Sequence, residues 1–395
     1  MKRSIAALVC GLAFSAISVS GQIFKIPQIG PKSTPKPVST PTMGGPVQQP
    51  VNQGNNGGTG TAQAPEGSDT PLMLKTSLDV RCDTENRYWK MPTESNYTSW
   101  IPQVKFKVRY TGATKLRLMA EYFTPDGKSW FTETLSTNQS SAAEKTVDIN
   151  SDRTAGRFEG KSTIATGLFG VKITDSRDGS VLFQGKFKVG KFKTGPSIPM
   201  FKNQNDFFVD QDWNLPIGYV WLNWGKDKNA PPPTVSMWIK GENRIDDMEA
   251  RLFYNGEQIL TTDEMGSASP SQSRYPNSLE NKETHRWELY NFEWYKFKYA
   301  ATQTGRNMFR QARFMNESDG TYTVKVFHKG VQIREASFTV SGGNLADNGV
   351  ASGNGFNDAK VLIPVKIMGD KDKWNSATWK SDAFYANPLT GFTWP

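Results

Sequence analysis

A two-residue alternation of apolar and polar side chains governs the sequence from Leu74 onward. In the stretch 104–110, apolar residues at every even position alternate with lysine and arginine. Successive side chains of a β-strand point to opposite faces of the sheet, so this pattern is typical of a strand with one buried face. A similar pattern over 116–122 ends at the turn sequence Pro125-Asp126-Gly127. The alternation therefore predicts antiparallel strands rather than helices.

The same succession of strands and turns recurs about 130 to 150 residues later. Apolar positions in 235–239 correspond to those of the first strand, and those in 248–252 correspond to the second. Asn255-Gly256 then stands where Asp126-Gly127 stood. Short alternating strands separated by turns are typical of β-sandwiches. The repeat therefore predicts an all-β chain with two tandem antiparallel β-sandwiches.

The closing hairpins of the two repeats also match in spacing. Phe187 and Val189 follow Gly179 by the same offsets at which Phe338 and Val340 follow Gly330. The stretch 320–330 (GTYTVKVFHKG) resembles the closing hairpin of immunoglobulin-like and fibronectin type III-like modules. The resemblance is to a fold rather than to a family, and it assigns no functional residue.

The first residues resemble a secretory signal peptide, which we expect to span 1–21. Two basic residues precede the apolar stretch 5–17, which is too short to cross a bilayer. An uncleaved anchor and a lipid attached to Cys10 are the alternatives, but the bulky Val9 disfavours lipidation. No later stretch has the length of a membrane-spanning helix. We therefore expect an exported protein in the periplasm, at the cell surface or outside the cell, without a transmembrane segment after cleavage.

The rest of the chain divides by composition. Residues 22–73 are rich in Pro, Gly, Gln and Asn and predict a disordered linker. The two sandwiches are expected at 74–195 and 196–343, the second with a short helix near 303–315. Residues 344–395 predict a Gly- and Asn-rich connection, one further strand and an aromatic C-terminal tail.

Charge and cysteine content limit the partners. The net charge of +9 becomes 9 − 2 = +7 once Lys2 and Arg3 leave with the signal peptide. A basic exported chain would attract glycans or anionic envelope polymers, whereas nucleic acid is not expected outside the cell. Cys82 is then the remaining thiol, which we expect to be buried, with an intermolecular disulfide as the alternative.

Two sets of residues are candidates for binding. The first is a basic stripe predicted on one sheet face, formed by Lys186, Lys188, Lys191 and Lys193. The second is a sugar-stacking platform of Trp221 and Trp224, flanked by Asn223 and Lys226. Most other tryptophans should belong to the core, although Trp374, Trp379 and Trp394 form a second aromatic set in the tail.

Motifs for catalysis or metal binding are weak. Neither His285 nor His328 has the spacing of a zinc site, and the sequence lacks a G-x-S-x-G elbow. Asp210, Asp212 and Asn214 alternate as oxygen ligands of Ca²⁺ would, but the residues that follow break the EF-hand pattern. We therefore predict no cofactor and treat Ca²⁺ as a weak candidate.

The sequence favours a non-catalytic exported protein that acts in binding or in envelope and surface assembly. Its partner would be a glycan, an anionic envelope polymer or another envelope protein. One alternative is a structural subunit of a surface assembly that docks through the apolar segment 22–29 or the tail. A second is a carboxylate-based hydrolase, because catalytic carboxylate pairs meet only in the fold.

Overall fold

The computed structural model describes residues 69–86, 98–141, 146–152, 160–193, 205–274, 285–300, 303–346 and 360–374. The expected signal peptide, residues 22–68 of the expected linker, and Trp379 and Trp394 lie outside these ranges. Most of the described residues are in β-strands, and the all-β prediction is confirmed. No helix in the described ranges is both long enough and apolar enough to cross a membrane.

Eight antiparallel strands form the first sheet, in the order β1-β2-β5-β4-β3-β6-β7-β8. Their bounds are β1 Leu72–Asn86, β2 Thr98–Arg109, β3 Leu118–Phe123, β4 Ser129–Ser141, β5 Thr146–Ser151, β6 Gly167–Asp175, β7 Val181–Lys193 and β8 Asn205–Val209. The long strand β4 pairs with β3 through 129–134 and with β5 through 135–141. The sheet curls, and its outermost strands meet where Thr84 of β1 donates to Asp206 Oδ1 of β8 at 3.0 Å.

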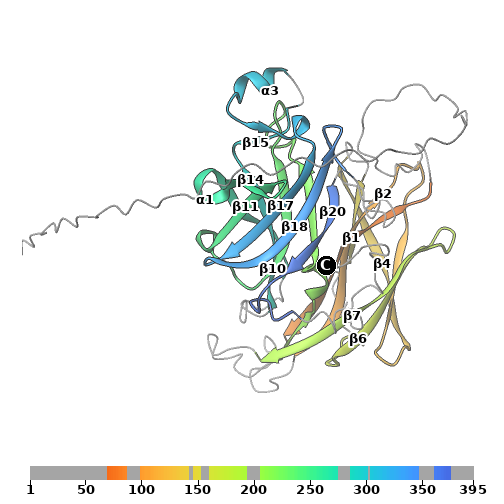
Figure 1. Ribbon diagram of the computed structural model, residues 1–395. Coiled ribbons are helices and arrows are strands. Elements are labelled where there is room, and N and C mark those ends of the chain that lie inside the picture. Colours follow the sequence, from red (N-terminus) through yellow and green to blue (C-terminus); the bar gives the residue numbers. More distant parts are fainter. Residues whose placement is uncertain are drawn as a thin grey trace, which may run out of the picture. The chain divides into compact units, whose positions relative to one another are not determined.

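The second sheet has the order β12-β11-β17-β18-β20-β9-β10-β14-β13, with β19 beside β18. Figure 1 shows β11, β17, β18 and β20 of this sheet side by side. Its strands are β9 Ile217–Leu222, β10 Pro233–Lys240, β11 Met248–Tyr254, β12 Glu257–Thr261, β13 Gly266–Arg274, β14 Trp287–Trp294, β17 Gly320–His328, β18 Val331–Ser341, β19 Asn344–Leu345 and β20 Lys360–Ile367. A separate parallel pair consists of β15 Phe297–Lys298 and β16 Arg313–Phe314.

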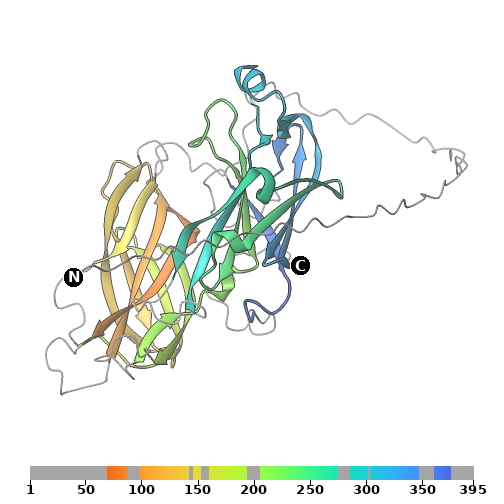
Figure 2. The ribbon, with the colours of Figure 1, turned by 90° about the vertical axis from the view of Figure 1, so that its left-hand side faces the viewer.

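Helices are short. Those that lie entirely within the described ranges are α1 Thr262–Met265, α3 Gln303–Met308 and the 3-10 turns Asp212–Asn214, Ile245–Asp247 and Met315–Glu317. Helix α3 covers the first part of the stretch 303–315 in which a helix was expected, and the strand β16 follows it. Both views place α3 at one end of the second sheet (Figures 1 and 2).

Two turns explain why hairpins form at the predicted positions. Asn255 and Gly256 between β11 and β12 have φ values of 48° and 90°, and Lys329 and Gly330 between β17 and β18 have values of 51° and 78°. Positive φ at both central residues matches the type I′ turn, whose twist suits a two-residue hairpin. The Asn-Gly signal in the sequence therefore identified a real hairpin.

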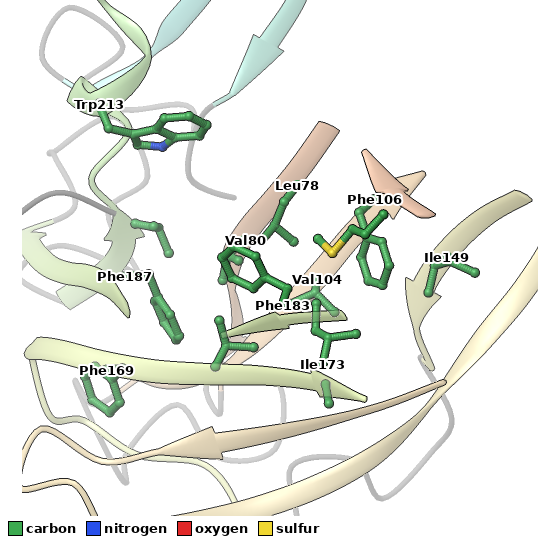
Figure 3. Packing of buried hydrophobic residues seen from close by; sticks show 14 of the residues in the cluster. Leu78, Val80, Val104, Phe106, Ile149, Phe169, Ile173, Phe183, Phe187 and Trp213 are labelled. Carbon is green, nitrogen blue, oxygen red and sulfur yellow. The ribbon is translucent and has the colours of Figure 1, made fainter. Parts of the chain in front are cut away.

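Apolar side chains fill two cores. The first lies within the first sheet, where residues from β1, β2, β5, β6 and β7 face one another (Figure 3). They include Leu78, Val80, Val104, Phe106, Ile149, Phe169, Ile173, Phe183 and Phe187. The second core lies within the second sheet and includes Val235, Met237, Ile239, Tyr290, Phe292 and Trp294. Cys82 is buried and free, as expected, and burial raises the pKa of its thiol well above the ordinary value.

Strand β10 is buried on both faces. Met237 and Ile239 point into the second core, whereas Trp238 between them belongs to the first core. Trp287 and Leu289 of β14 also join the first core. The two sheets therefore share apolar surface instead of being independent modules.

Candidate binding face of the second sheet

The candidate site lies on the face of β10 and β14 that points away from the second core. Along β10 this face carries Thr234, Ser236 and Trp238, and along β14 it carries Glu293, Asn291, Leu289 and Trp287, because alternate residues share a face. The half with Trp238, Leu289 and Trp287 is apolar and packs into the first core. The other half is polar, and we call it the binding face.

Glu293 is the centre of the binding face. Its Oε1 accepts hydrogen bonds from Thr234 Oγ1 at 2.6 Å and from Asn223 Nδ2 at 3.0 Å, while Oε2 pairs with Lys226 Nζ. The Glu293 side chain is 7% exposed. Burial alone would raise the pKa of this carboxyl, but the three donors outweigh burial and hold the pKa below its ordinary value. Glu293 is therefore ionised at neutral pH, with its charge balanced by Lys226.

The loop between β9 and β10 brings Asn223 and Lys226 to Glu293. The Asn223 N–H donates to the Pro232 carbonyl at 3.0 Å and closes the base of the loop. The Asn223 Oδ1 accepts the Lys226 N–H at 3.2 Å, so one side chain contacts both Lys226 and Glu293. Asp227 Oδ1 accepts two further N–H groups of the loop, from Asn229 and Ala230. These hydrogen bonds hold the loop in one conformation.

Three aromatic residues border the binding face, and we call them the aromatic rim: Trp224, Tyr295 and Tyr299. Trp224 is 44% exposed and Tyr295 is 49% exposed, both high values for large aromatic residues. Tyr299 contacts Trp224 edge to face, with ring centroids 6.1 Å apart. Lys226 Nζ lies 5.7 Å from the centroid of the Tyr295 ring. The rim therefore joins the Glu293 network through Lys226.

Trp221 extends the polar half toward β20. Its Nε1 donates to Ser236 Oγ at 3.1 Å, and Ser236 Oγ donates to Asn291 Oδ1 at 2.8 Å. Lys360 Nζ of β20 lies 5.2 Å from the Trp221 ring centroid. The ring is half-buried and packs against the first core. It therefore supports the binding face and offers less free surface than Trp224.

The structure brings the aromatic candidates together. Trp221, Asn223, Trp224 and Lys226 all lie on or beside the binding face. The expected core tryptophans Trp213, Trp238, Trp287 and Trp294 are buried. Trp374 is half-buried against the first core and presents no free platform.

The lysine candidates do not form a single stripe. The pairing of β7 with β6 and β8 runs without a register shift from Phe183 to Lys193. Lys186 and Lys188 therefore lie on one face of β7, and Lys191 and Lys193 lie on the other, because side chains alternate along a strand. The prediction of one stripe was wrong, because Lys188 and Lys191 are three residues apart and an odd separation places side chains on opposite faces.

The three Ca²⁺ candidates are directed at other partners. Asp212 accepts from Lys240 Nζ at 2.8 Å and from Trp287 Nε1 at 2.8 Å, and Asp210 Oδ1 accepts the Asp212 N–H. Asn214 Nδ2 donates to the Gln211 carbonyl and side chain. Burial, and then the neighbouring Asp210, raise the pKa of Asp212 despite Lys240. Among the described residues no group of three or more His, Cys, Asp or Glu side chains is placed to hold a metal ion.

Sequence reasoning missed Glu293, Thr234 and Tyr295. The stretch 287–294 (WELYNFEW) contained the signal, because its odd positions end in Asn291 and Glu293 after two large apolar residues. The change from apolar to polar residues on one face of β14 marks the point where this face stops packing against the first core. The loop between β9 and β10 meets Glu293 because β10 pairs with both β9 and β14, and this long-range pairing is not visible in the sequence.

No protein-family model matches the chain, and a search of curated proteins gave no significant match. The binding face combines exposed aromatic surface, amide and hydroxyl groups, and a carboxylate whose charge is neutralised. Such a surface suits an uncharged ligand with both apolar and hydroxylated sides.

Proposed function

We propose that the chain is an exported, non-catalytic binding protein that holds a glycan on the aromatic rim of the second sheet. The observation that carries the proposal is the pair of half-exposed rings, Trp224 and Tyr295, next to the buried Glu293 network. Sugar rings have apolar C–H faces and hydroxyl edges. The apolar faces would stack on the aromatic rim, and the hydroxyls would bond Asn223 and Lys226.

Rigidity of the rim supports this proposal. Trp224 and Tyr295 flank strands whose other face lies in the second core, and the Tyr295 N–H donates to the Met265 carbonyl at 2.8 Å. A ring that is already held loses little conformational entropy when a ligand stacks on it. The predicted signal peptide and the basic charge of the chain agree with an exported protein that meets envelope or extracellular glycans.

The test is a glycan array probed with the full chain after signal removal, followed by calorimetry with the glycan that binds best. We expect the double variant Trp224→Ala/Tyr295→Ala to bind that glycan roughly tenfold more weakly or worse, because stacked surface is lost. Val331→Ala is the matched control. Val331 is 64% exposed on β18, so its substitution also removes exposed apolar surface.

Salt separates stacking from charge attraction. Binding that persists at high salt supports the aromatic rim, whereas binding that disappears would indicate a charged surface and contradict the proposal. Equal affinities of the double variant and the native chain would also overturn it. Absence of binding to any glycan, together with self-association in light scattering, would favour a structural subunit.

A further inference from the structure

A polar cavity opens on the first sheet, far in sequence from the aromatic rim. Its volume is about 440 Å³, within the range of roughly 300–1,000 Å³ that is usual for small-molecule sites. Its walls come from β1, β2, β4 and β5, and Val104 is the one apolar residue among the described residues that line it. Ligand pockets are usually mostly apolar, so this lining selects a polar ligand.

The register of the sheet aligns four lining residues in one row. Asp79 of β1 pairs with Lys105 of β2, Lys105 pairs with Asn150 of β5, and Asn150 pairs with Ser136 of β4. Neighbouring strands lie about 4.8 Å apart, so the row spans about 14 Å. This row is long enough to meet a ligand of more than one ring.

Unused hydrogen-bonding groups occupy most of the row. The side chains of Lys105, Asn150 and Ser136 form no hydrogen bond or ion pair within the part of the chain that the structure describes. Arg81, two residues beyond Asp79 on the same face, is instead held in place. Its Nε donates to Asp79 Oδ2 at 2.7 Å and its Nη2 donates to the Ser273 carbonyl at 3.4 Å. The cavity thus combines free groups with a fixed guanidinium.

The row stands on a rigid support. Along β1 and β5, the residues next to the row point the other way into the first core, where Val80 and Ile149 are fully buried (Figure 3). Side chains on strands that are packed in this way present a preorganised surface, which lowers the cost of ordering on binding. The described residues that line the cavity also balance in charge, with two cations, Arg81 and Lys105, and two carboxylates, Asp79 and Asp152.

We propose that this cavity is a second binding site, which takes an uncharged polyhydroxylated ligand of one or two sugar rings. Lys105 and Arg81 donate to ligand hydroxyls, and Asn150 and Ser136 both donate and accept. Balanced charge disfavours an anionic ligand, and the polar lining disfavours an apolar one. The site does not depend on the aromatic rim of the second sheet.

The test uses the full chain and four neutral disaccharides, cellobiose, maltose, lactose and chitobiose, with glucuronic acid as an anionic probe. We expect saturation-transfer NMR to detect at least one disaccharide at millimolar concentration. Lys105→Met and Asn150→Leu should each weaken its binding about tenfold, the loss expected for a hydrogen bond to a charged or buried polar partner. Both side chains lack partners, so both variants should keep the native melting temperature.

Two further variants make the outcome specific. Lys107→Met removes a lysine from the same face of β2, one alternate position away and outside the cavity lining, and it should leave binding unchanged. Trp224→Ala/Tyr295→Ala should also leave it unchanged, which separates this site from the aromatic rim. Failure of every disaccharide to bind would overturn the proposal. Binding of glucuronic acid alone, or equal affinities of Asn150→Leu and the native chain, would do so as well.

Discussion

Glu293 shows how one buried carboxylate can organise a surface. Removing its charge from water is unfavourable, and only the donors from Lys226, Thr234 and Asn223 make its burial tolerable. Lys226 lowers the pKa of Glu293 more than Thr234 or Asn223 does, and all three donors act through hydrogen bonds to the carboxylate. The network therefore fixes the loop 223–232 mainly through hydrogen bonds.

Replacing Glu293 with alanine should lower the free energy of unfolding by about 1–3 kcal/mol, because Thr234 and Asn223 would lose their acceptor. Urea denaturation at neutral pH measures this change. Glu257→Ala is the control, since Glu257 is exposed on β12 and its loss should change stability by less than about 0.5 kcal/mol. Equal effects of the two substitutions would show that Glu293 does not organise the loop.

Strand β20 changes its pairing partner partway along its length. Residues 360–364 pair with β9, and 365–367 pair with β18, so β20 joins the two halves of the second sheet. The change of partner occurs at Pro364, which has no N–H to donate to a ladder. In the first sheet the long strand β4 makes the equivalent connection. The corresponding strand β12 has only 5 residues and cannot extend that far.

A buried ion pair fixes the segment that follows β20. Asp372 Oδ2 pairs with Arg334 of β18, and Asp372 Oδ1 accepts the Lys240 N–H of β10 at 3.0 Å. Burial alone would raise the pKa of Asp372, but Arg334 and Lys371 outweigh burial and lower it. A lowered folded-state pKa means that this contribution to stability is complete above the unfolded pKa of about 4 and is lost as pH falls through the folded value.

We therefore expect stability to change little with this group above about pH 5 and to fall below about pH 4. Asp372→Asn should be less stable than the native chain at pH 7, with the difference shrinking as pH falls. Urea denaturation at a series of pH values from 7 down to about 4 measures the difference in the free energy of unfolding. Asp370→Asn, at an exposed position two residues away, serves as the control. A difference that is independent of pH would contradict this role of Asp372.

Strands with local signals could be predicted, whereas the arrangement of the site could not. Alternation over 104–110 and the turn at Asn255-Gly256 depend on neighbouring residues, so the sequence displays them directly. The meeting of Asn223 with Glu293 depends on long-range pairing of β9, β10 and β14. The lysines of β7 are a different case, because the local pattern was sufficient and the prediction did not follow it. Strict alternation along the strand places Lys188 and Lys191 on opposite faces.

At the scale of the whole molecule, the sequence repeat corresponds to a repeat in strand order. The run β4-β3-β6-β7-β8 of the first sheet recurs as β12-β11-β17-β18-β20 in the second, and β1-β2-β5 recurs as β9-β10-β14. The two sheets differ in where polar side chains gather on their outer faces. The outer face of the first holds the polar cavity, while that of the second divides into a packed apolar half and the binding face.

Arg274 illustrates how the two sheets are joined. It is almost fully buried, and its Nη1 donates to Gln211 Oε1 at 3.0 Å. Its guanidinium lies 4.8 Å from the Trp238 ring centroid, and its Nε lies 3.7 Å from Asp79 Oδ1 of the first sheet. A single side chain thus contacts β1, β10 and the segment after β8. The binding face therefore rests on a support that extends across both sheets.

The indole N–H signals of the 12 tryptophans offer the most direct test of the proposed glycan site. They can be followed by NMR while the full chain is titrated with the best glycan from the array, and Trp224→Ala identifies the Trp224 signal. We expect that signal to shift in proportion to the bound fraction, while those of the buried Trp100 and Trp294 stay in place. An unchanged Trp224 signal at saturating glycan would contradict binding on the aromatic rim.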